Sequence, residues 1–309
     1  DNLEIRGGVT VDSVLFDGDR AVGVRAVVDG RVEDIAATEA VVLAAGAVHS
    51  PAILQRSGIG PSDHLRTLGL DTRIDLPVGL GFQDHPAVFL PIVLDQAAVS
   101  PPDFRHTNVC VRYSSELAGV SPNDMLIVAM NRFGDSLGSH LAGAGGGLGM
   151  IGVWVNECRS TGSVLIRSTD PTVHPEVAEN MLSHPDDVRR MRDGVRRLAD
   201  LGHHHAARAI GQPRELFAAG TTDDELDAMA LRRSGDTQHA TSTCRMGADD
   251  DPRTVVDTDA RVLGVDGLRV VDASIMPTVV RANTHLTTVM LAEHLAARWT
   301  GSTAAHAPV

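Results

Sequence analysis

Short runs of alternating or continuous hydrophobic residues fill the beginning of the chain. Such runs are typical of β-strands when polar turn residues separate them. Asp17-Gly18 and Asp29-Gly30 are turn pairs of the kind that closes a hairpin. The last run is continuously apolar, as in a strand that is buried on both faces of a parallel sheet. The pattern predicts an antiparallel meander that returns to a parallel sheet, with strands at residues 3–6, 9–16, 21–28 and 40–44.

A helix is predicted in the segment after the last of these strands. Ser50 is a candidate N-cap, and Pro51 stands at the first helical position, where proline is tolerated. Residues 57–61 read SGIGP, and this combination of glycine and proline ends a helix.

The middle of the chain, from about residue 87 to residue 235, has the pattern of a separate domain. Val188, Met191 and Val195 recur at helical spacing and predict an amphipathic helix over residues 185–201. The strands predicted in this part are residues 109–113, 125–129, 150–156 and 162–166.

Residues 147–152 read GLGMIG and match the glycine spacing of a dinucleotide-binding turn. The match follows the low-complexity run 142–147, whereas the fingerprint requires a hydrophobic strand before it. Residues 153–155 read VWV, which indicates a strand instead of the helix that must follow. We interpret the segment as a loop and not as a phosphate-binding site.

The composition excludes several classes of protein. The 309 residues are 43% hydrophobic, which is enough for a substantial core, and no apolar run approaches the length of a membrane span. The formal net charge of −13 disfavours binding to nucleic acid. The three cysteines are far apart and lack metal-site spacing, so we expect no metal, and a reducing, cytoplasmic setting fits best.

Three blocks in the last quarter of the chain carry the strongest chemical signal. They read QHATSTCRMG at residues 238–247, LRVVDASIMP at 268–277 and NTHLTT at 283–288. In that order they resemble the carboxy-terminal half of the glucose-methanol-choline (GMC) family of flavin oxidoreductases.

Two earlier segments carry the same resemblance. Residues 46–60 read GAVHSPAILQRSGIG, and residues 77–86 read PVGLGFQDHP, with Phe82 where a leucine is expected. The resemblance is strongest over residues 38–86 and 236–298.

The resemblance implies a mixed fold of α/β and α+β type. It predicts an incomplete FAD-binding Rossmann-like domain and a substrate domain in which helices back a large antiparallel sheet. A complete FAD domain begins with a strand, a glycine-rich turn and a helix, and this unit is missing from the first fifty residues. We therefore expect the carboxy-terminal portion of a longer protein. Its expected parts are residues 1–86 and 236–300 for FAD binding, 87–235 for substrate binding, and a disordered tail at 301–309.

His239 is the candidate catalytic base. Oxidation of an alcohol requires loss of the hydroxyl proton, and histidine suits this role because its ordinary pKa lies near neutrality. Asn283 is the second candidate, since its amide can donate to an alkoxide or accept from a hydroxyl. His285 is the rival for this second position, because some members of the family use a histidine there. The spacing to Glu293 favours Asn283 in the family register.

FAD is the cofactor that the resemblance implies. A helix is predicted over residues 286–298, and the partial positive charge at its amino end would stabilise negative charge on the flavin. A short buried strand at residues 268–271 precedes Asp272, and ligands of open α/β sheets bind at such strand ends. The residues expected to contact FAD are Val11, Ala45, Gly46, Asp272, Ala273, Asn283, Thr284, His285 and Thr287.

The predicted function is flavin-dependent oxidation of an alcohol by a choline-dehydrogenase-like enzyme. A small-molecule alcohol is the expected partner, and the electron acceptor is left open between oxygen, a quinone and another carrier. Two alternatives remain: an FAD-containing lyase of the hydroxynitrile type, and a truncated, non-catalytic chain or subunit that cannot hold FAD. An aromatic content of 3% disfavours an aromatic cage for a quaternary ammonium substrate.

Overall fold

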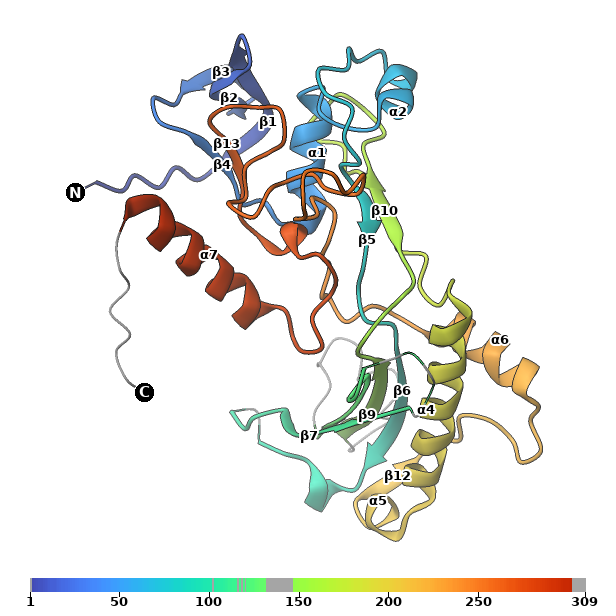
Figure 1. The fold of residues 1–309 in the computed structure, drawn as a ribbon. Helices are drawn as coiled ribbons and strands as arrows, with labels where there is room; N and C mark the ends of the chain where they lie inside the picture. Colours follow the sequence, from blue (N-terminus) through green and yellow to red (C-terminus); the bar gives the residue numbers. More distant parts are fainter. Residues whose placement is uncertain are drawn as a thin grey trace. The chain divides into compact units, whose positions relative to one another are not determined.

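The computed structural model describes residues 2–101, 103–115, 117, 119, 121–131 and 147–301 (Figure 1). The predicted disordered tail, apart from residue 301, and residues 142–146 of the low-complexity run lie outside the described residues. The fold is of mixed α/β class, as the resemblance predicts. No helix in the described part of the chain is long and apolar enough to cross a membrane. The chain forms two compact units, one from residues 1–83, 161–180 and 239–309, the other from residues 84–160 and 181–238.

The first unit contains an antiparallel sheet with the strand order β1-β2-β3. Asp29 and Gly30 both have positive φ values, 49° and 74°, which is the backbone of a two-residue hairpin turn. The predicted meander is thus confirmed. Its strands are β1 (Val9–Asp17), β2 (Arg20–Val28) and β3 (Arg31–Ala36).

Two details of the predicted meander are wrong. Residues 3–6 do not form a strand: Leu3 and Ile5 are 80% and 85% exposed, and no described strand pairs with this segment. Alternation of apolar residues is not sufficient, because a strand needs a hydrogen-bonding partner. The prediction also lacks β3, whose residues are mostly polar and exposed and whose register is set by pairing with β2.

The parallel pair that the apolar run predicts is present in the same unit. It consists of β4 (Val41–Leu43) and β13 (Leu268–Val270), whose buried side chains belong to the core of the unit. A third sheet has the order β11-β10-β5, with strands Glu176–Ala178, Gly162–Leu165 and Leu80–Phe82. The helices of the unit are α1 (Gly46–Arg56), α2 (Ser62–Thr67), α7 (His285–Thr300) and the short η2 (Ala273–Ile275).

Helix α1 begins at Gly46, so the predicted start at Pro51 is wrong. The Asp272 carboxylate accepts from the Gly46 N–H at 2.9 Å and thereby caps the helix from a distant part of the chain. Pro51 lies inside the helix, where it lacks the N–H that would bond to the carbonyl of Ala47. The Thr243 hydroxyl donates to that carbonyl at 2.7 Å instead. A side chain of the QHATSTCRMG block thus compensates for the proline.

Residues 161–180, which the sequence analysis assigns to the middle part of the chain, belong to the first unit. The fully buried Gln55 side chain of α1 holds this segment. Its Nε2 donates to the carbonyls of Val78 at 3.1 Å and Val164 at 2.9 Å, and its Oε1 accepts from the Ile166 N–H at 2.9 Å.

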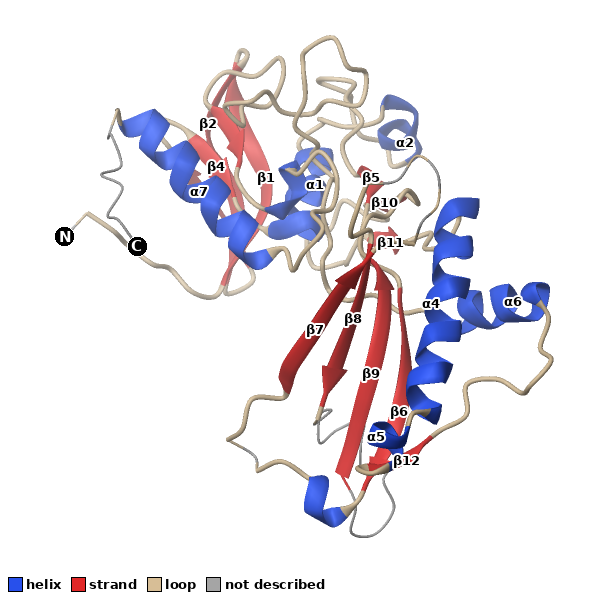
Figure 2. Ribbon diagram, turned by 60° about the horizontal axis from the view of Figure 1, so that its bottom comes forward, coloured by secondary structure: helices blue, strands red, loops and turns tan. Residues whose placement is uncertain are grey.

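The second unit is built on an antiparallel five-stranded sheet with the order β12-β6-β9-β8-β7 (Figure 2). Helix α4 (Pro185–His203) packs along β9 and β6, and α6 (Asp223–Arg233) packs against α4. The predicted antiparallel sheet with helices behind it is confirmed. The other elements are β6 (Ala87–Leu94), β7 (Thr107–Tyr113), β8 (Met125–Met130), β9 (Gly147–Val155), β12 (Gly211–Pro213), η1 (Gln96–Ala98) and α5 (His205–Arg208).

The GLGMIG segment lies within β9, so its interpretation as a loop is wrong. The next described element after β9 is strand β10 and not a helix, and the segment therefore lacks the geometry of a dinucleotide-binding turn. Gly152 pairs with Phe89 of β6, and a Cβ added to Gly152 would lie 2.6 Å from the Phe89 ring. The glycine leaves room for an aromatic side chain on the neighbouring strand.

Candidate active site

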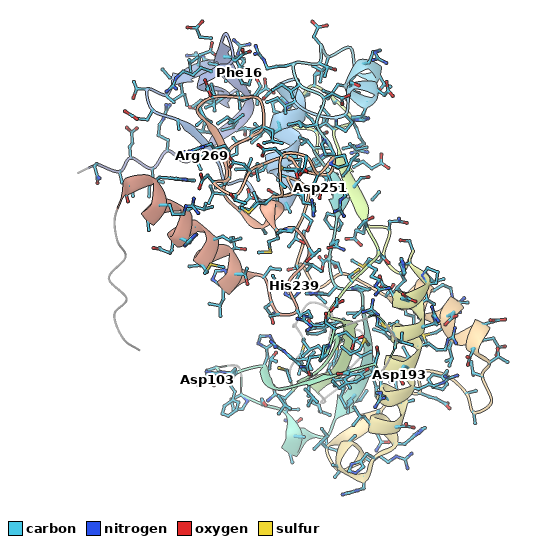
Figure 3. All side chains as sticks on the ribbon, viewed as in Figure 1. Phe16, Asp103, Asp193, His239, Asp251 and Arg269 are labelled. Carbon is cyan, nitrogen blue, oxygen red and sulfur yellow. The ribbon has the colours of Figure 1, made fainter. Side chains whose placement is uncertain are left out.

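His239 and Asn283 lie next to each other in the first unit. The amide Nδ2 of Asn283 is 3.2 Å from Nε2 of His239. His239 is 8% exposed and lies on a loop (Figure 3), and Asn283 lies shortly before α7. Two residues that are 44 positions apart in the sequence therefore meet at hydrogen-bonding distance.

This contact is compatible with one form of the histidine ring. Because an amide nitrogen only donates, the arrangement fits a ring whose Nε2 accepts and whose proton is on Nδ1. A neutral imidazole with a free electron pair on Nε2 can take a proton from a hydroxyl group. A substrate oxygen that replaced the direct contact would meet a proton acceptor and an amide donor side by side.

The backbone on both sides of His239 is strained. Gln238 and Ser242 have φ values of 60° and 72°, in the left-handed region that residues other than glycine rarely adopt. The Ser242 N–H donates to the Ala273 carbonyl at 3.4 Å, and the Ser242 hydroxyl lies 3.1 Å from Oγ1 of Thr241. Strain of this kind persists only where surrounding contacts compensate for it, and it concentrates at functional sites.

Asp272 joins the carboxyl ends of the two parallel strands. Its Oδ2 accepts from the Gly46 N–H at 2.9 Å and from the Ser50 hydroxyl at 2.5 Å, and its Oδ1 accepts from the Ser274 N–H at 2.8 Å. The structure thus brings together Gly46 and Asp272, which the sequence analysis predicts at one site. The role of Ser50 was missed, because nothing in the local sequence indicates a partner 222 positions away.

Small residues leave open space where the chain passes from β4 into α1. Ala45 is exposed, and Gly46 has a φ of 81°. A Cβ built on Gly46 would meet no heavy atom within 4 Å. Ala273 follows Asp272 and begins η2. A ligand can approach the backbone closely at such a position, which lies at the carboxyl ends of parallel strands.

The amino end of α7 combines an uncapped backbone with exposed apolar side chains. No side chain caps the helix at Thr284, and the first turn holds no acidic residue, so its N–H groups present partial positive charge. Leu286, Val289 and Met290 are 79%, 45% and 53% exposed. Exposed apolar residues at helical spacing form a patch of the kind that marks a binding surface.

These features fit FAD, which has a large, partly apolar ring system and an anionic pyrophosphate. The chain offers an apolar helix face, an uncapped helix end and open backbone at Gly46. Thr284 is 9% exposed, and His285 and Thr287 lie in the first turn of α7. Val11 lies in β1, in a different sheet from β4 and β13, and its carbonyl accepts from the Arg56 guanidinium at 3.4 Å.

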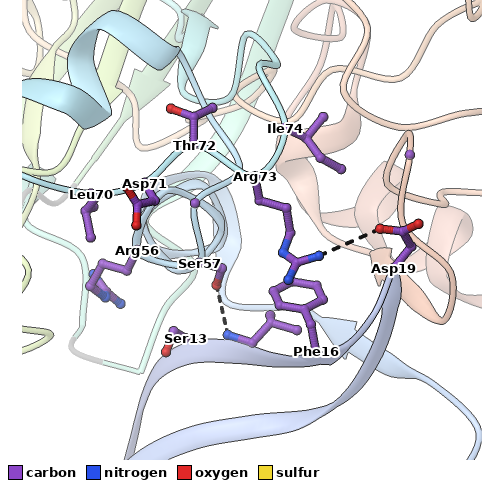
Figure 4. Close-up of a pocket in the computed structure, with 13 residues that line it drawn as sticks. Ser13, Phe16, Asp19, Arg56, Ser57, Leu70, Asp71, Thr72, Arg73 and Ile74 are labelled. Carbon is purple, nitrogen blue, oxygen red and sulfur yellow. Dashed lines mark hydrogen bonds and ion pairs between the residues drawn. The ribbon is translucent and has the colours of Figure 1, made fainter.

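A cavity of about 600 Å³ lies elsewhere in the first unit and contains none of the predicted site residues (Figure 4). The Arg73 guanidinium lies 4.2 Å from the centre of the Phe16 ring and 3.9 Å from the Asp19 carboxylate. Burial lowers the pKa of Arg56 on another wall of the cavity. Arg73 thus already contacts groups of the unit itself, and the cavity lies outside the candidate site.

Two family models match the chain, and both carry the description GMC oxidoreductase. The amino-terminal model matches residues 1–87, and the carboxy-terminal model matches residues 158–292. The second match includes His239, Asp272 and Asn283.

Curated proteins with known names are similar over almost the whole chain. The chain is 34% identical to the oxygen-dependent choline dehydrogenase of Stenotrophomonas maltophilia (strain K279a), over 96% of this chain and 56% of that protein. It is 35% identical to the 5-(hydroxymethyl)furfural oxidase of Methylovorus sp. (strain MP688), over 96% of this chain and 57% of that protein. The chain spans little more than half the length of these relatives.

Solved structures share the fold. Pyridoxine 4-oxidase from Mesorbium loti superposes with a TM-score of 0.83 and 25% identity, over 95% of this chain and 57% of that one. Formate oxidase has a TM-score of 0.83 and 21% identity, over 96% of this chain and 60% of that one. Family models, relatives and fold agree that the chain belongs to the GMC oxidoreductase family.

Proposed function

We propose that this chain acts in the FAD-dependent oxidation of an alcohol, with His239 as the base. The observation that carries the proposal is the 3.2 Å contact between His239 Nε2 and Asn283 Nδ2 in a member of the GMC family. Two relatives are named for choline and 5-(hydroxymethyl)furfural, which both carry a hydroxyl group. These names support a small alcohol as the substrate class.

In the proposed reaction, the substrate hydroxyl replaces the direct contact between the two side chains. Nε2 of His239 accepts the hydroxyl proton, and the imidazole becomes a cation. Nδ2 of Asn283 donates to the substrate oxygen as negative charge develops on it. FAD, when bound, supplies the acceptor for the hydride of the carbinol carbon. The small exposed fraction of His239 limits competition from water for the same nitrogen.

The residues proposed to hold FAD belong to the same unit as this pair. The uncapped amino end of α7 supports a role in binding the flavin, and the open backbone at Gly46 supports close approach of the cofactor. The proposed contacts are Val11, Ala45, Gly46, Asp272, Ala273, Asn283, Thr284, His285 and Thr287.

The proposed roles of the parts of the chain follow the boundaries predicted from the sequence. Residues 1–86 and 236–300 are proposed to bind FAD, and residues 87–235 are proposed to bind the alcohol. A cytoplasmic location is proposed because all three cysteines are free thiols. The acceptor that reoxidises the flavin is proposed to be oxygen, a quinone or another carrier.

The test uses the purified chain incubated with FAD and desalted. Product formation from a panel of primary and secondary alcohols is then compared between the wild type, His239→Gln and Asn283→Ala. We expect retained flavin absorption in all three, with oxidation lowered about 10²–10⁴-fold by His239→Gln and about 10²-fold by Asn283→Ala. His294→Gln, at an exposed position of α7, is the matched control and should oxidise at the wild-type rate.

A colourless protein after desalting would overturn the proposal for this chain and favour a chain that cannot hold FAD. Undiminished oxidation by His239→Gln would overturn the assignment of the base.

A further inference from the structure

Gln83 is hydrogen-bonded to the segment that carries His239. The Gln83 N–H donates to the Thr241 carbonyl at 3.2 Å, and the Gln83 carbonyl accepts from the Thr241 N–H at 2.9 Å. The same carbonyl accepts from the Thr241 hydroxyl at 3.2 Å. Since Thr241 stands between His239 and the strained Ser242, these bonds fix the backbone that presents the imidazole.

The side chain of Gln83 reaches the segment that carries Asn283. Its Oε1 accepts from the Val279 N–H at 3.0 Å, across 196 positions of sequence. Gln83 is only 6% exposed, and Val279 is 5% exposed. A buried N–H group left without its acceptor costs free energy, so the loop before Asn283 would move if Oε1 were absent.

We infer that Gln83 is a positioning residue that sets the separation of His239 Nε2 and Asn283 Nδ2. One residue binds both catalytic segments: the His239 segment through its backbone, and the Asn283 segment through its side chain. Its effect on rate rests on the proposed function, whereas its effect on the geometry of the pair does not. A displacement of about 1 Å in a catalytic group can lower a rate by about 10²-fold.

Gln55 provides a matched control. It is also a buried glutamine of the first unit, and its amide makes three hydrogen bonds to backbone groups. Its partners are Val78, Val164 and Ile166, none of which belongs to the segments that carry His239 and Asn283. Loss of the Gln55 amide therefore removes hydrogen bonds within the unit, none of which is made directly to either segment.

The experiment compares Gln83→Met with Gln55→Met, because methionine keeps the length of the side chain and removes the amide. The first readout is the ring resonance of His239 in NMR spectra of the chain without FAD, assigned by its absence in His239→Gln. We expect Gln83→Met to move this resonance in the same direction as Asn283→Ala. Gln55→Met should leave it in place while it lowers Tm at least as much, because the Gln55 amide makes three hydrogen bonds.

The second readout is steady-state kinetics of the FAD-loaded protein. Gln83→Met should lower kcat about 10–100-fold, with KM changed less than about threefold. The reason is that the separation of His239 and Asn283 changes while substrate binding is kept. If Gln83→Met does not fold, Gln83→Asn gives the same test, since its amide is too short to reach the Val279 N–H.

The two readouts separate the inference from the proposed function. A displaced His239 resonance in a chain that oxidises no alcohol would support the inference and contradict the proposed function. An unchanged resonance and an unchanged kcat in a folded Gln83 variant would overturn the inference.

Discussion

Ser50 and Asp272 are 222 positions apart in the sequence, and the Ser50 hydroxyl donates to Oδ2 of Asp272 at 2.5 Å. The same oxygen accepts from the Gly46 N–H at 2.9 Å. One buried carboxylate therefore ties the start of α1 to the end of β13, where the cofactor is proposed to bind. The negative charge lies at the amino end of a helix, where the helix dipole favours it.

Replacement of Asp272 by asparagine should destabilise the first unit. Asparagine has one side-chain oxygen where aspartate has two. Its NH₂ group would therefore face at least one of the donors that now bond to the carboxylate, and that buried donor would lose its partner. The expected loss is about 1–3 kcal/mol in the free energy of unfolding, measured by urea denaturation. Ser50→Ala should lose about 1 kcal/mol. The double variant should lose less than the sum, and strict additivity would show that the two groups are not coupled.

Gly46→Ala and Gly79→Ala can be compared directly, because both glycines have a positive φ, 81° and 87°. A Cβ at Gly79 would lie 2.1 Å from the Val164 carbonyl oxygen and 2.5 Å from Nε2 of Gln55, whereas a Cβ at Gly46 meets open space. Gly46→Ala should therefore cost only about 1–2 kcal/mol of backbone strain. Gly79→Ala should cost clearly more than that in the same urea titration.

FAD retention should be lowered by Gly46→Ala although this variant is the less destabilised of the two. Gly46→Ala adds a methyl group at the proposed approach to the cofactor, so it should lose flavin on desalting while it stays folded. Flavin retention by folded Gly46→Ala equal to that of the wild type would contradict the proposed cofactor position.

The cysteines should differ in reactivity. Burial raises the pKa of the Cys158 and Cys244 thiols, and the carboxylates of Asp187 and Asp272 add to this effect. Cys110 is exposed. Since the thiolate is the reactive form, iodoacetamide at about pH 8 should modify Cys110 in the native protein and all three cysteines only in urea. Mass spectrometry of the alkylated chain checks this, and rapid native modification of Cys244 would disprove it.

Asp251 should make the stability of the first unit dependent on pH in the acid range. Hydrogen bonds from Arg253, and then the interaction with Arg245, hold the pKa of Asp251 well below its usual range. A depressed pKa stabilises the fold above the unfolded value of about 4, and this contribution is lost as the pH falls through the folded value. In urea titrations, the difference between wild type and Asp251→Asn should be constant above about pH 5 and should shrink toward lower pH. An unchanged difference down to about pH 2.5 would contradict the ion-pair account.

The sequence predicts elements well where the local pattern and the tertiary partner agree. Helix α4 was predicted because its apolar residues recur at helical spacing and face the sheet of the second unit. The hairpin at Asp29 and Gly30 was predicted because the turn residues themselves determine the backbone.

Other elements depend on partners that no local pattern indicates. Strand β6 was missed although it is apolar, and it contains Pro91, which lacks the N–H that a strand inside a sheet normally donates. The strand is held on both sides by β9 and β12, and the Pro91 carbonyl accepts from the Arg214 N–H at 2.9 Å. The start of α1 was misplaced for a related reason, since Asp272 provides its cap.

The candidate site also combines features that the local sequence predicts with contacts that it does not predict. The short blocks around His239 and Asn283 identify the chemical groups, and the structure places these groups 3.2 Å apart. The contacts that hold them, such as the hydrogen bond from Val279 to Gln83, join positions 196 residues apart. No spacing rule within a single segment predicts such a contact.

The most direct test of the central claim is the anaerobic absorption spectrum of the FAD-loaded chain before and after addition of an alcohol. Loss of the flavin band on addition of a primary alcohol, in the wild type and not in His239→Gln, is the predicted result, because a hydride reaches the flavin only if His239 removes the hydroxyl proton. A retained flavin band that no alcohol of the panel bleaches would contradict alcohol oxidation and would favour a lyase that keeps FAD without using it in redox chemistry.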